Sequence, residues 1–277
     1  MSIENKIWNY IIMYPDVYIK VISKNTRLVT ELKKYKGKTL AQKIYNIHGI
    51  QLIKKKYRKK LLDFLALSKS QLRQDLFVIS ETDFKKNGFF VEIGAADGKI
   101  CSNTFLLEKH FHWQGILVEP AKIFHKRLHK NRDSSIDKSI IWNKNIENLN
   151  FTECHTASTI SKKRGASLIP PNHNTKCYDL RSITPMQLLK KYNAPRYIDY
   201  LSIDTEGSEF EILSSIDFKK YKFGIITVEH NFRPDRKKIY ELLSGNGYKI
   251  RLGAPRSFED WYLYETNSDK ELKCGIQ

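Results

Sequence analysis

The feature that most constrains the fold of this 277-residue chain is the stretch from Phe89 to Pro120. It begins with an apolar run over 89–93 that is typical of a buried strand, and this run continues into a turn with two glycines. A helical stretch and a second apolar run follow, and the second run ends in an acidic residue, Glu119. A strand, a glycine turn that opens a helix and a carboxylate roughly 20 residues later form the nucleotide-binding unit of doubly wound α/β folds. The sequence therefore predicts such a fold, with a ligand site at this turn.

The charge of the turn distinguishes it from a dinucleotide site. Its sequence is Gly94-Ala95-Ala96-Asp97-Gly98, and Glu92 lies two residues before it. A dinucleotide fingerprint has three glycines, which let the helix N-terminus approach a pyrophosphate. Two carboxylates here would repel a phosphate but suit a cationic ligand, such as the amino group of S-adenosylmethionine. The turn therefore favours S-adenosylmethionine as the cofactor.

Length and composition limit the class of protein. The chain has room for one large α/β domain and an additional segment, and its apolar content of 41% is compatible with a hydrophobic core. No apolar run reaches the ~20 residues that span a bilayer, and the first residues do not have the pattern of a secretory signal. The four cysteines have no C-x-x-C spacing, so neither a zinc site nor a disulfide framework is predicted. A cytoplasmic location is therefore expected.

Positive charge is concentrated near the N-terminus. Residues 1–60 hold 15 Lys and Arg and 3 Asp and Glu, a net charge of +12, which leaves +6 of the total +18 for the rest of the chain. Residues 1–22 and 50–67 have apolar side chains at helical spacing, so a basic helical segment is predicted over residues 1–70. Three uses of this segment remain open: a solvated face, packing or homo-oligomerisation, and peripheral docking on the inner face of an anionic membrane.

From about residue 70 strands alternate with helices. Strands are expected over residues 89–93, 115–118, 139–142, 200–203, 224–228, 248–251 and 261–264, and helices over 103–109, 124–129, 186–192, 209–214 and 235–246. This alternation predicts a mainly parallel sheet, and the short loop between the last two strands allows an antiparallel hairpin at one edge. Thr184-Pro185 and Gly245-Asn246-Gly247 are a helix start and a helix stop. We therefore divide the chain into the segment 1–70, an α/β domain 71–267 and a C-terminal tail 268–277.

Polar residues follow four of the expected strands. They are the glycine turn, Glu119, Asp204-Thr205-Glu206-Gly207 and Glu229-His230-Asn231. Ligands of open α/β sheets bind beyond the carboxyl ends of the strands, so these residues are expected to surround one site. Glu119 can accept hydrogen bonds from both hydroxyls of a ribose, and an adenine pocket is expected near residues 140–143.

Three runs of the chain together resemble the FkbM-type S-adenosylmethionine-dependent methyltransferases. They are FFVEIGAADGKICSNTFLLEK…GILVEP, YIDYLSIDTEGSEFEILSSIDF and ITVEHN, and the resemblance extends over about residues 71–264. It implies the class I methyltransferase fold, and O-methylation of a sugar in a nucleotide sugar or surface glycan, or of a natural product. The implied cofactor contacts are Glu92, Gly94, Ala95, Asp97, Gly98, Ser102, Asn103, Glu119 and Pro120. Asp204, Glu206, Glu229 and His230 would face the substrate.

Methyl transfer to a sugar hydroxyl needs a group that removes the hydroxyl proton. His230 is the predicted general base because its unperturbed pKa lies near neutral pH, with Asp204 and Glu206 as further catalytic residues. Alternatively, His230 only orders the strand tip. In a rival mechanism Asp204 and Glu229, together with His230 or Asn231, hold Mg²⁺ or Mn²⁺, and the metal lowers the pKa of the hydroxyl. Asp204 and Glu206 also have a structural interpretation, because acidic residues cap helices such as the one expected at 209–214.

Two basic stretches and the overall charge bear on the partner. Residues 156–171 are either a mobile lid, with Lys162, Lys163 and Arg164 facing a phosphorylated substrate, or a surface loop. The expected helix after Pro120 is basic and is typical of a solvated face.

The charge favours an anionic acceptor, such as a sugar nucleotide or lipid-linked sugar. An RNA methyltransferase is the alternative, but enzymes that methylate bases have [DN]-P-P-[FYW] where this chain has Asp204-Thr205-Glu206-Gly207, so nucleic acid is not the favoured partner. A non-catalytic adaptor that keeps the fold is disfavoured, because the expected site residues are all present: Glu92, Asp97, Glu119, Asp204 and His230.

Overall fold

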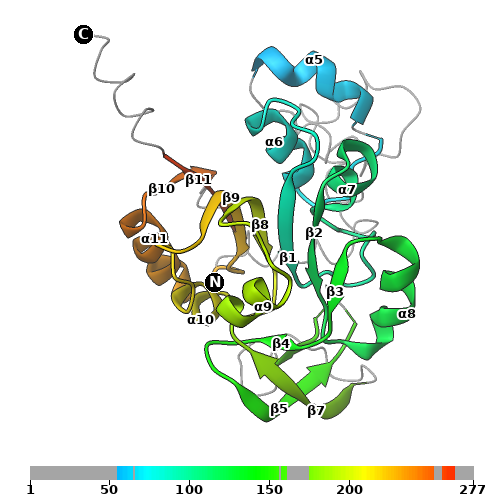
Figure 1. Ribbon diagram of the computed structural model, residues 1–277, viewed down its shortest axis with the longest axis vertical. Helices are drawn as coiled ribbons and strands as arrows, with labels where there is room; N and C mark the ends of the chain where they lie inside the picture. Colours follow the sequence, from blue (N-terminus) through cyan, green and yellow to red (C-terminus); the bar gives the residue numbers. More distant parts are fainter. Residues whose placement is uncertain (1–54, 65, 156, 161–174, 253–257, 266–277) are drawn as a thin grey trace, which may run out of the picture.

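The computed structural model describes residues 55–64, 66–155, 157–160, 175–252 and 258–265 (Figure 1). Residues 1–54, the basic triplet 162–164 of the expected lid and the tail 268–277 lie outside the described residues, so the expectations for them stay predictions. Within the described part, no helix has the length and apolar character that crossing a bilayer requires.

A seven-stranded sheet forms the centre of the molecule. Its order is β3 (Ser135–Asp137), β2 (Gln114–Val118), β1 (Phe89–Ile93), β8 (Tyr197–Ile203), β9 (Lys222–Glu229), β11 (Glu259–Tyr264) and β10 (Tyr248–Leu252). The pairs from β3 to β9 are parallel, and β11 is antiparallel to both β9 and β10. The predicted doubly wound, mostly parallel sheet with a C-terminal antiparallel hairpin is confirmed. β11, the last strand among the described residues, lies inside the sheet, and β10 forms its edge.

Helices cover both faces of this sheet (Figure 1). On one face α6 (Gln74–Glu81) and α7 (Phe105–Phe111) share an apolar cluster with Phe90. On the other face α9 (Pro185–Lys191), α10 (Glu209–Ser214) and α11 (Asp235–Gly245) share a cluster with Val91. Phe90 and Val91 belong to different clusters because successive side chains of a strand point to opposite faces. Burial on both faces explains why the strands read as continuous apolar runs.

Local chemistry sets the ends of the helices that the sequence predicts best. The Thr184 hydroxyl accepts a hydrogen bond from the Gln187 N–H, and the Gln187 side chain accepts one from the Thr184 N–H, so α9 begins with a capping box followed by Pro185. α11 ends at Gly245, as predicted, and the chain then turns through Gly247, which has a φ of +87°.

The described end of the N-terminal segment packs on the α/β domain. It consists of the short helical turns η1 (Lys55–Tyr57), α5 (Arg58–Leu61) and η2 (Leu62–Phe64). Leu61 is buried in the same cluster as α6 and α7, with Tyr57 and Phe64 against it. Packing on the core therefore accounts for the apolar side chains of this short part, and the domain boundary at residue 70 stays a prediction.

A second, smaller sheet was not expected from the sequence. It pairs β4 (Ile140–Ile141), β7 (Lys176–Ile183), β5 (Ile146–Glu153) and β6 (Thr159–Ile160) in this order. The prediction of a main-sheet strand over 139–142 is wrong, because β3 is the third parallel strand and β4 pairs with β7 instead. β3 has three residues, two of them polar, and so has almost no hydrophobic pattern. The first half of β5 is largely exposed, so it also lacks a hydrophobic pattern from which a strand could be predicted.

Candidate functional site

The glycine turn joins the carboxyl ends of three neighbouring strands. The N–H groups of Gly94 and Ala95 donate to the carbonyl oxygen of Val118 at the end of β2, each at 3.0 Å. The N–H of Asp204, after β8, donates to the carbonyl oxygen of Ile93 at 2.9 Å. Gly94 has a φ of +94°, and a Cβ there would lie 1.8 Å from the carbonyl oxygen of Asp204. Glycine is therefore required at this position, and it lets the turn contact the tip of β8.

Glu119 holds the turn from the side of β2. Its carboxylate is buried and accepts hydrogen bonds of 2.7 Å from the N–H of Ala96 in the turn and from that of Ala121, just before α8 (Lys122–Asn131). Burial raises the pKa of Glu119 to about 7, although the two hydrogen bonds act in the opposite direction. The carboxylate thus ties the glycine turn to the start of α8.

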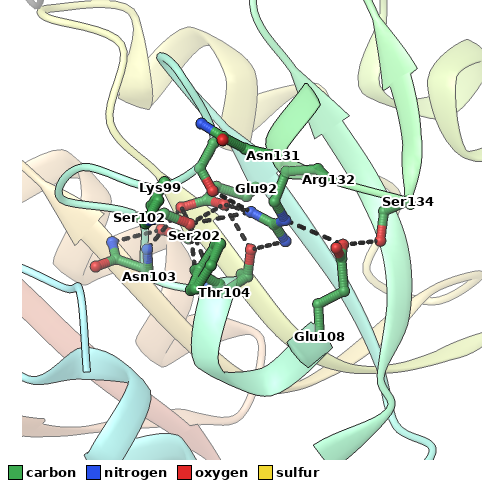
Figure 2. Close-up of polar contacts among 12 residues, drawn as sticks. Glu92, Lys99, Ser102, Asn103, Thr104, Glu108, Asn131, Arg132, Ser134 and Ser202 are labelled. Atoms are coloured by element: carbon green, nitrogen blue, oxygen red, sulfur yellow. Dashed lines mark hydrogen bonds and ion pairs between the residues drawn. The ribbon is translucent and has the colours of Figure 1, made fainter. Parts of the chain in front are cut away.

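Behind the turn, Glu92 belongs to a buried polar network (Figure 2). Its carboxylate accepts hydrogen bonds from Ser102 Oγ at 3.0 and 3.2 Å, from the Asn103 N–H at 2.7 Å and from Thr104 Oγ1 at 2.5 Å. The guanidinium of Arg132, the residue after α8, lies 3.5 Å from the same carboxylate. The structure therefore places Glu92 as an anchor for residues 102–104, and not where the predicted cofactor contact would require it.

Arg132 is a component of this network that sequence reasoning missed. Its Nη1 donates to the carbonyl oxygen of Gly98 at 3.0 Å and to Ser102 Oγ at 3.1 Å, and Nη2 donates to Thr104 Oγ1 at 2.8 Å (Figure 2). Its Nε lies 3.0 Å from Glu108 of α7. The only signal in the sequence is an arginine at the end of a basic helix, which does not tell a buried arginine from its exposed neighbours.

Asp97 and Gly98 shape the turn. Asp97 Oδ1 accepts hydrogen bonds from the N–H groups of Lys99 at 3.0 Å and Ile100 at 2.8 Å. A Cβ at Gly98 would lie 2.6 Å from the side chains of both Leu128 and Arg132, so a glycine here lets the turn pack on α8. Asp97 and Gly98 therefore stabilise the conformation of the turn, and a direct cofactor contact by either residue stays a prediction.

Three carboxylates gather at the tips of β8 and β9. Asp204, Glu206 and Glu229 each bring an oxygen within 4.8 Å of the others, and we call them the acidic cluster. Asn231 Nδ2 donates to Glu229 at 2.7 Å and to Glu206 at 3.3 Å, and Arg233 Nη2 lies 3.4 Å from Glu206. The sequence prediction that these three acids converge agrees with this geometry.

Burial raises the pKa of every member of the acidic cluster. Burial raises the pKa of Asp204 to about 6, and burial together with the charge of Asp204 raises that of Glu206 to about 8. The same two causes raise the pKa of Glu229 well above its ordinary value. Because the three groups interact, the cluster titrates as a unit and retains protons at neutral pH. Groups with such pKa values are suited to proton transfer.

His230 points away from the acidic cluster. Its Nδ1 accepts a hydrogen bond from the Phe232 N–H at 3.1 Å, and its Nε2 lies 3.4 Å from Asp260 Oδ1. The ring is buried, and Arg236 donates two hydrogen bonds, of 2.9 and 2.7 Å, to the same Asp260. The prediction of His230 as general base and as metal ligand therefore conflicts with the structure. The alternative interpretation, in which His230 orders the strand tip, fits it.

A cavity of about 470 Å³ lies over these strand tips. This volume is within the range of about 300–1,000 Å³ that is typical of small-molecule and cofactor sites. The predicted site residues that line it are Gly94, Ala95, Ser102, Glu119, Pro120, Asp204, Glu206 and Glu229. Those that do not line it are Glu92, Asp97, Gly98, Asn103 and His230.

The second sheet supplies a wall of the cavity that the sequence did not predict. β4 contributes Ile140 and Ile141, in the region where an adenine pocket was expected, and β5 contributes Phe151. Thr159 of β6 also lines the cavity, and its hydroxyl donates to the carbonyl oxygen of Glu206 at 3.1 Å. This hydrogen bond connects the second sheet to the backbone of the loop that carries Asp204 and Glu206.

Left-handed backbone conformations are concentrated around the cavity. Twelve described residues other than glycine have a positive φ, and six of them line the cavity: Ala96, Cys101, His155, Glu206, Asn231 and Phe232. Such conformations are uncommon outside glycine and persist only where the surrounding structure holds them. Their concentration here indicates that the cavity is a functional site.

Comparison with known proteins finds a matching family model and similar solved structures. Residues 92–263 match the family model described as Methyltransferase FkbM domain. Among solved structures, the chain is similar to precorrin-6y C5,15-methyltransferase from Geobacter metallireducens GS-15, with 10% identity, a TM-score of 0.42, and coverage of 72% of this chain and 91% of that one. It is also similar to ribosomal protein L11 methylase from Lactobacillus delbrueckii subsp. bulgaricus, with 10% identity, a TM-score of 0.37 and coverage of 70% and 78%. No curated protein sequence matches the chain.

The matched region begins in β1 and ends in the C-terminal hairpin, so it includes the glycine turn, Glu119 and the acidic cluster. The sheet order around it has the switch point of a Rossmann-like sheet between β1 and β8, where the cavity lies. The family model covers more than half of the chain, and its match agrees with the resemblance seen in the sequence. The chain therefore belongs to the FkbM methyltransferase family and has the class I methyltransferase fold.

Proposed function

We propose that this protein is an S-adenosylmethionine-dependent O-methyltransferase whose acceptor is a hydroxyl of a sugar, in a nucleotide sugar, a capsular or lipopolysaccharide unit or another surface glycan. The family supports methyl transfer from S-adenosylmethionine. The observation that supports a hydroxyl acceptor is the acidic cluster, which borders the cavity next to the glycine turn. A cytoplasmic location is part of the proposal and is supported by the free thiols of Cys101, Cys154 and Cys177.

The acidic cluster has the chemistry to bind a polyhydroxylated group. A carboxyl group accepts hydrogen bonds when it is ionised and also donates one when it is protonated, so Asp204, Glu206 and Glu229 together match a ligand with several hydroxyl groups, which donate and accept as well. Among the described residues that line the cavity there is no Lys or Arg. The part of the acceptor that enters the cavity is therefore uncharged in our proposal, and a phosphate or other anionic group of the acceptor lies outside.

Asp204 is the proposed general base. Its pKa, raised by burial to about 6, leaves it largely ionised at neutral pH, whereas Glu206, with a pKa of about 8, is largely protonated. The acceptor O–H bond would break as its proton passes to an Asp204 oxygen, and the electron pair left on the acceptor oxygen would form the new bond to the methyl carbon. The bond between that carbon and the sulfonium sulfur would break at the same time, with its electron pair remaining on the sulfur. General-base catalysis typically contributes ~10²–10⁴-fold to a rate. The rest of the acceleration would come from holding the reactants in place.

The residues of the cavity fit S-adenosylmethionine. The backbone of Gly94 to Ala96 is free of long side chains, Glu119 stands at the tip of β2, and Ile140 and Ile141 supply an apolar wall. In our proposal the turn holds the amino-acid part, Glu119 the ribose and the apolar wall the adenine. When bound, the cofactor supplies a methyl group on a positively charged sulfur.

The acidic cluster also fits a divalent cation. Asp204, Glu206 and Glu229 would hold Mg²⁺ or Mn²⁺, since both prefer oxygen ligands, and Asn231 offers an amide oxygen if its side chain is flipped. A bound metal would supply Lewis acidity to an acceptor hydroxyl. Turnover that is unchanged after exhaustive chelation would exclude this variant of the proposal and leave Asp204 as the base.

The test is a mass-spectrometric assay with S-adenosylmethionine labelled in its methyl group. The protein is offered nucleotide sugars, neutral oligosaccharides, hydroxylated natural products and RNA in separate reactions. We expect label on a sugar hydroxyl, and a loss of ~10²–10⁴-fold in turnover for Asp204→Asn. Asp179→Asn, an exposed carboxylate of β7, is the matched control and should retain full turnover. Label on RNA, or on a natural product without label on any sugar, would contradict the proposed acceptor.

A further inference from the structure

The outer face of α8 is cationic along its whole length. Ile123, Lys126, Arg127 and Lys130 are exposed and follow the spacing i, i+3, i+4, i+7, which places them on one stripe of the helix. Phe124 and Leu128 of α8 are buried on the opposite side. Figure 1 shows α8 on the outer side of the molecule, next to β3. The helix is therefore strongly amphipathic, with its basic stripe turned to solvent.

The basic stripe has no acidic partners in the described part of the chain. α8 contains no Asp or Glu, and among the described residues no carboxylate forms an ion pair with Lys126, Arg127 or Lys130. Lys122 precedes the stripe and is exposed as well. A solvated face on a helix usually mixes both signs of charge. Unpaired positive charge on one stripe instead generates a local potential that attracts an anionic surface.

Two exposed aliphatic side chains lie close to this charge and to the cavity. Ile100 is 62% exposed and Ile123 is 43% exposed, and they are two of the four large apolar side chains that stand out as exposed among the described residues. Ile100 itself lines the cavity, and Pro120 and Phe124, on either side of Ile123, line it too. The two isoleucines follow β1 and β2, which are neighbours in the sheet, so both lie at its carboxyl edge.

We propose that the stripe of α8, together with Ile100 and Ile123, docks this protein on an anionic phospholipid bilayer with the cavity opening at the membrane surface. Lys126, Arg127 and Lys130 contact the lipid headgroups, and the isoleucines enter the boundary between headgroups and acyl chains. Nucleic acid is the weaker match, because single strands are bound by aromatic side chains on which bases stack, and the exposed apolar residues here are aliphatic. The cavity would then receive its acceptor from the bilayer surface.

Vesicle binding by the complete chain tests this proposal. The variant Lys126→Gln/Arg127→Gln/Lys130→Gln is compared with Lys190→Gln/Lys219→Gln/Lys220→Gln, which removes the same charge from exposed lysines at the amino ends of β8 and β9, opposite the cavity. On vesicles containing phosphatidylserine, we expect binding by the α8 variant to be about 100-fold weaker than by the wild type, and binding by the control to be changed by less than about fivefold. The N-terminal segment is present in both proteins, so it does not account for a difference. Equal losses in the two variants would overturn the proposal.

Insertion of Ile123 is measured separately with vesicles whose acyl chains carry bromine, which quenches tryptophan on contact. The variant Ile123→Trp is compared with Tyr240→Trp, at an exposed position of α11. After subtraction of the wild-type signal, we expect the added fluorescence of Ile123→Trp to be quenched and that of Tyr240→Trp to be unaffected. Absence of quenching at Ile123, or binding of the stripe to RNA without binding to vesicles, would refute the docking. None of these readouts depends on the acceptor or on turnover.

Discussion

Replacing Arg132 by methionine tests whether the buried network behind the glycine turn supports both the fold and the cofactor site. The Arg132 side chain is 0% exposed, and it lies between Glu92 and Glu108, whose side chains are 4% and 6% exposed. Its guanidinium also donates to the carbonyl oxygen of Gly98 in the turn. Methionine keeps a similar apolar stem but removes every donor. Arg132→Met therefore leaves two carboxylates buried without their cation.

The size of the effect follows from this burial. Removing one partner of a buried ion pair destabilises a protein by about 3–5 kcal/mol, because the remaining charge is left uncompensated. Glu92 keeps its hydrogen bonds from Ser102 and Thr104 in the variant, so we expect a loss near the middle of that range, about 4 kcal/mol at pH 7. Arg181→Met is the matched control. Arg181 and its partner Glu147 are 62% and 74% exposed, and such pairs contribute about 0–1 kcal/mol.

The stability loss of Arg132→Met should depend on pH in a defined direction. Burial acts to raise the pKa of Glu108, but Arg132 and the hydrogen bonds from Ser134 and the Asp133 N–H lower it below its ordinary value. A lowered carboxyl pKa stabilises the fold above the unfolded-state pKa of roughly 4.5, and this stabilisation is lost as the pH falls through the folded-state value. Without Arg132 the effect of burial prevails and raises the pKa of Glu108. The difference between wild type and variant should therefore be large at pH 7 and shrink as the pH is lowered towards 4.5.

Urea unfolding followed by circular dichroism at pH 7 and pH 5 measures both quantities. We also expect the affinity for S-adenosylmethionine, determined by calorimetry well below the unfolding midpoint, to fall by roughly tenfold, which equals about 1.4 kcal/mol. A loss below 1 kcal/mol at pH 7, or a loss that grows on acidification, would show that the guanidinium does not compensate the two carboxylates. Unchanged cofactor affinity would show that the network does not position the turn.

Three further outcomes are expected. Gly94→Ala should abolish detectable S-adenosylmethionine binding in calorimetry, because the new Cβ would lie 1.8 Å from the Asp204 carbonyl oxygen. Gly247→Ala is the control and should retain binding, since Gly247 also has a positive φ of +87° but a Cβ there would lie 3.3 Å from its nearest neighbour. Equal affinities of the two variants would contradict the close contact between the glycine turn and Asp204. His230→Ala should lower the melting temperature but reduce turnover by less than tenfold, and a drop of ~10²–10⁴-fold would restore His230 as the base. Because burial raises the pKa of Glu206 to about 8, the folded state holds a proton that the unfolded state releases near pH 4.5, so stability from this group falls as the pH rises from about 5 to 8. Melting temperatures of Glu206→Gln should decline less over that range than those of the wild type, and parallel curves would refute the assignment.

The part of the site that the sequence predicted depends on strand order and spacing alone. Glu119, Asp204 and Glu229 each follow an apolar strand, and parallel strands present their carboxyl ends at one edge, so their convergence could be expected without coordinates. Glu206 lies only two residues after Asp204, so it too could be expected near this edge. Local signals were equally reliable: α9 begins with the capping box that Thr184-Pro185 indicated.

Tertiary structure alone decided which way the neighbouring side chains point. His230 directly follows Glu229, but its buried ring lies against Asp260 of β11, 30 residues later in the chain, and does not line the cavity. Glu92 likewise faces Arg132, 40 residues away in the chain, and nothing in either local sequence shows that they meet. The second sheet escaped prediction because its stability comes from pairing β5 with β7, strands that lie far apart in the sequence and are partly polar. Spacing along a chain determines which residues reach the same edge of a sheet, whereas contacts between distant segments determine which of them face the ligand.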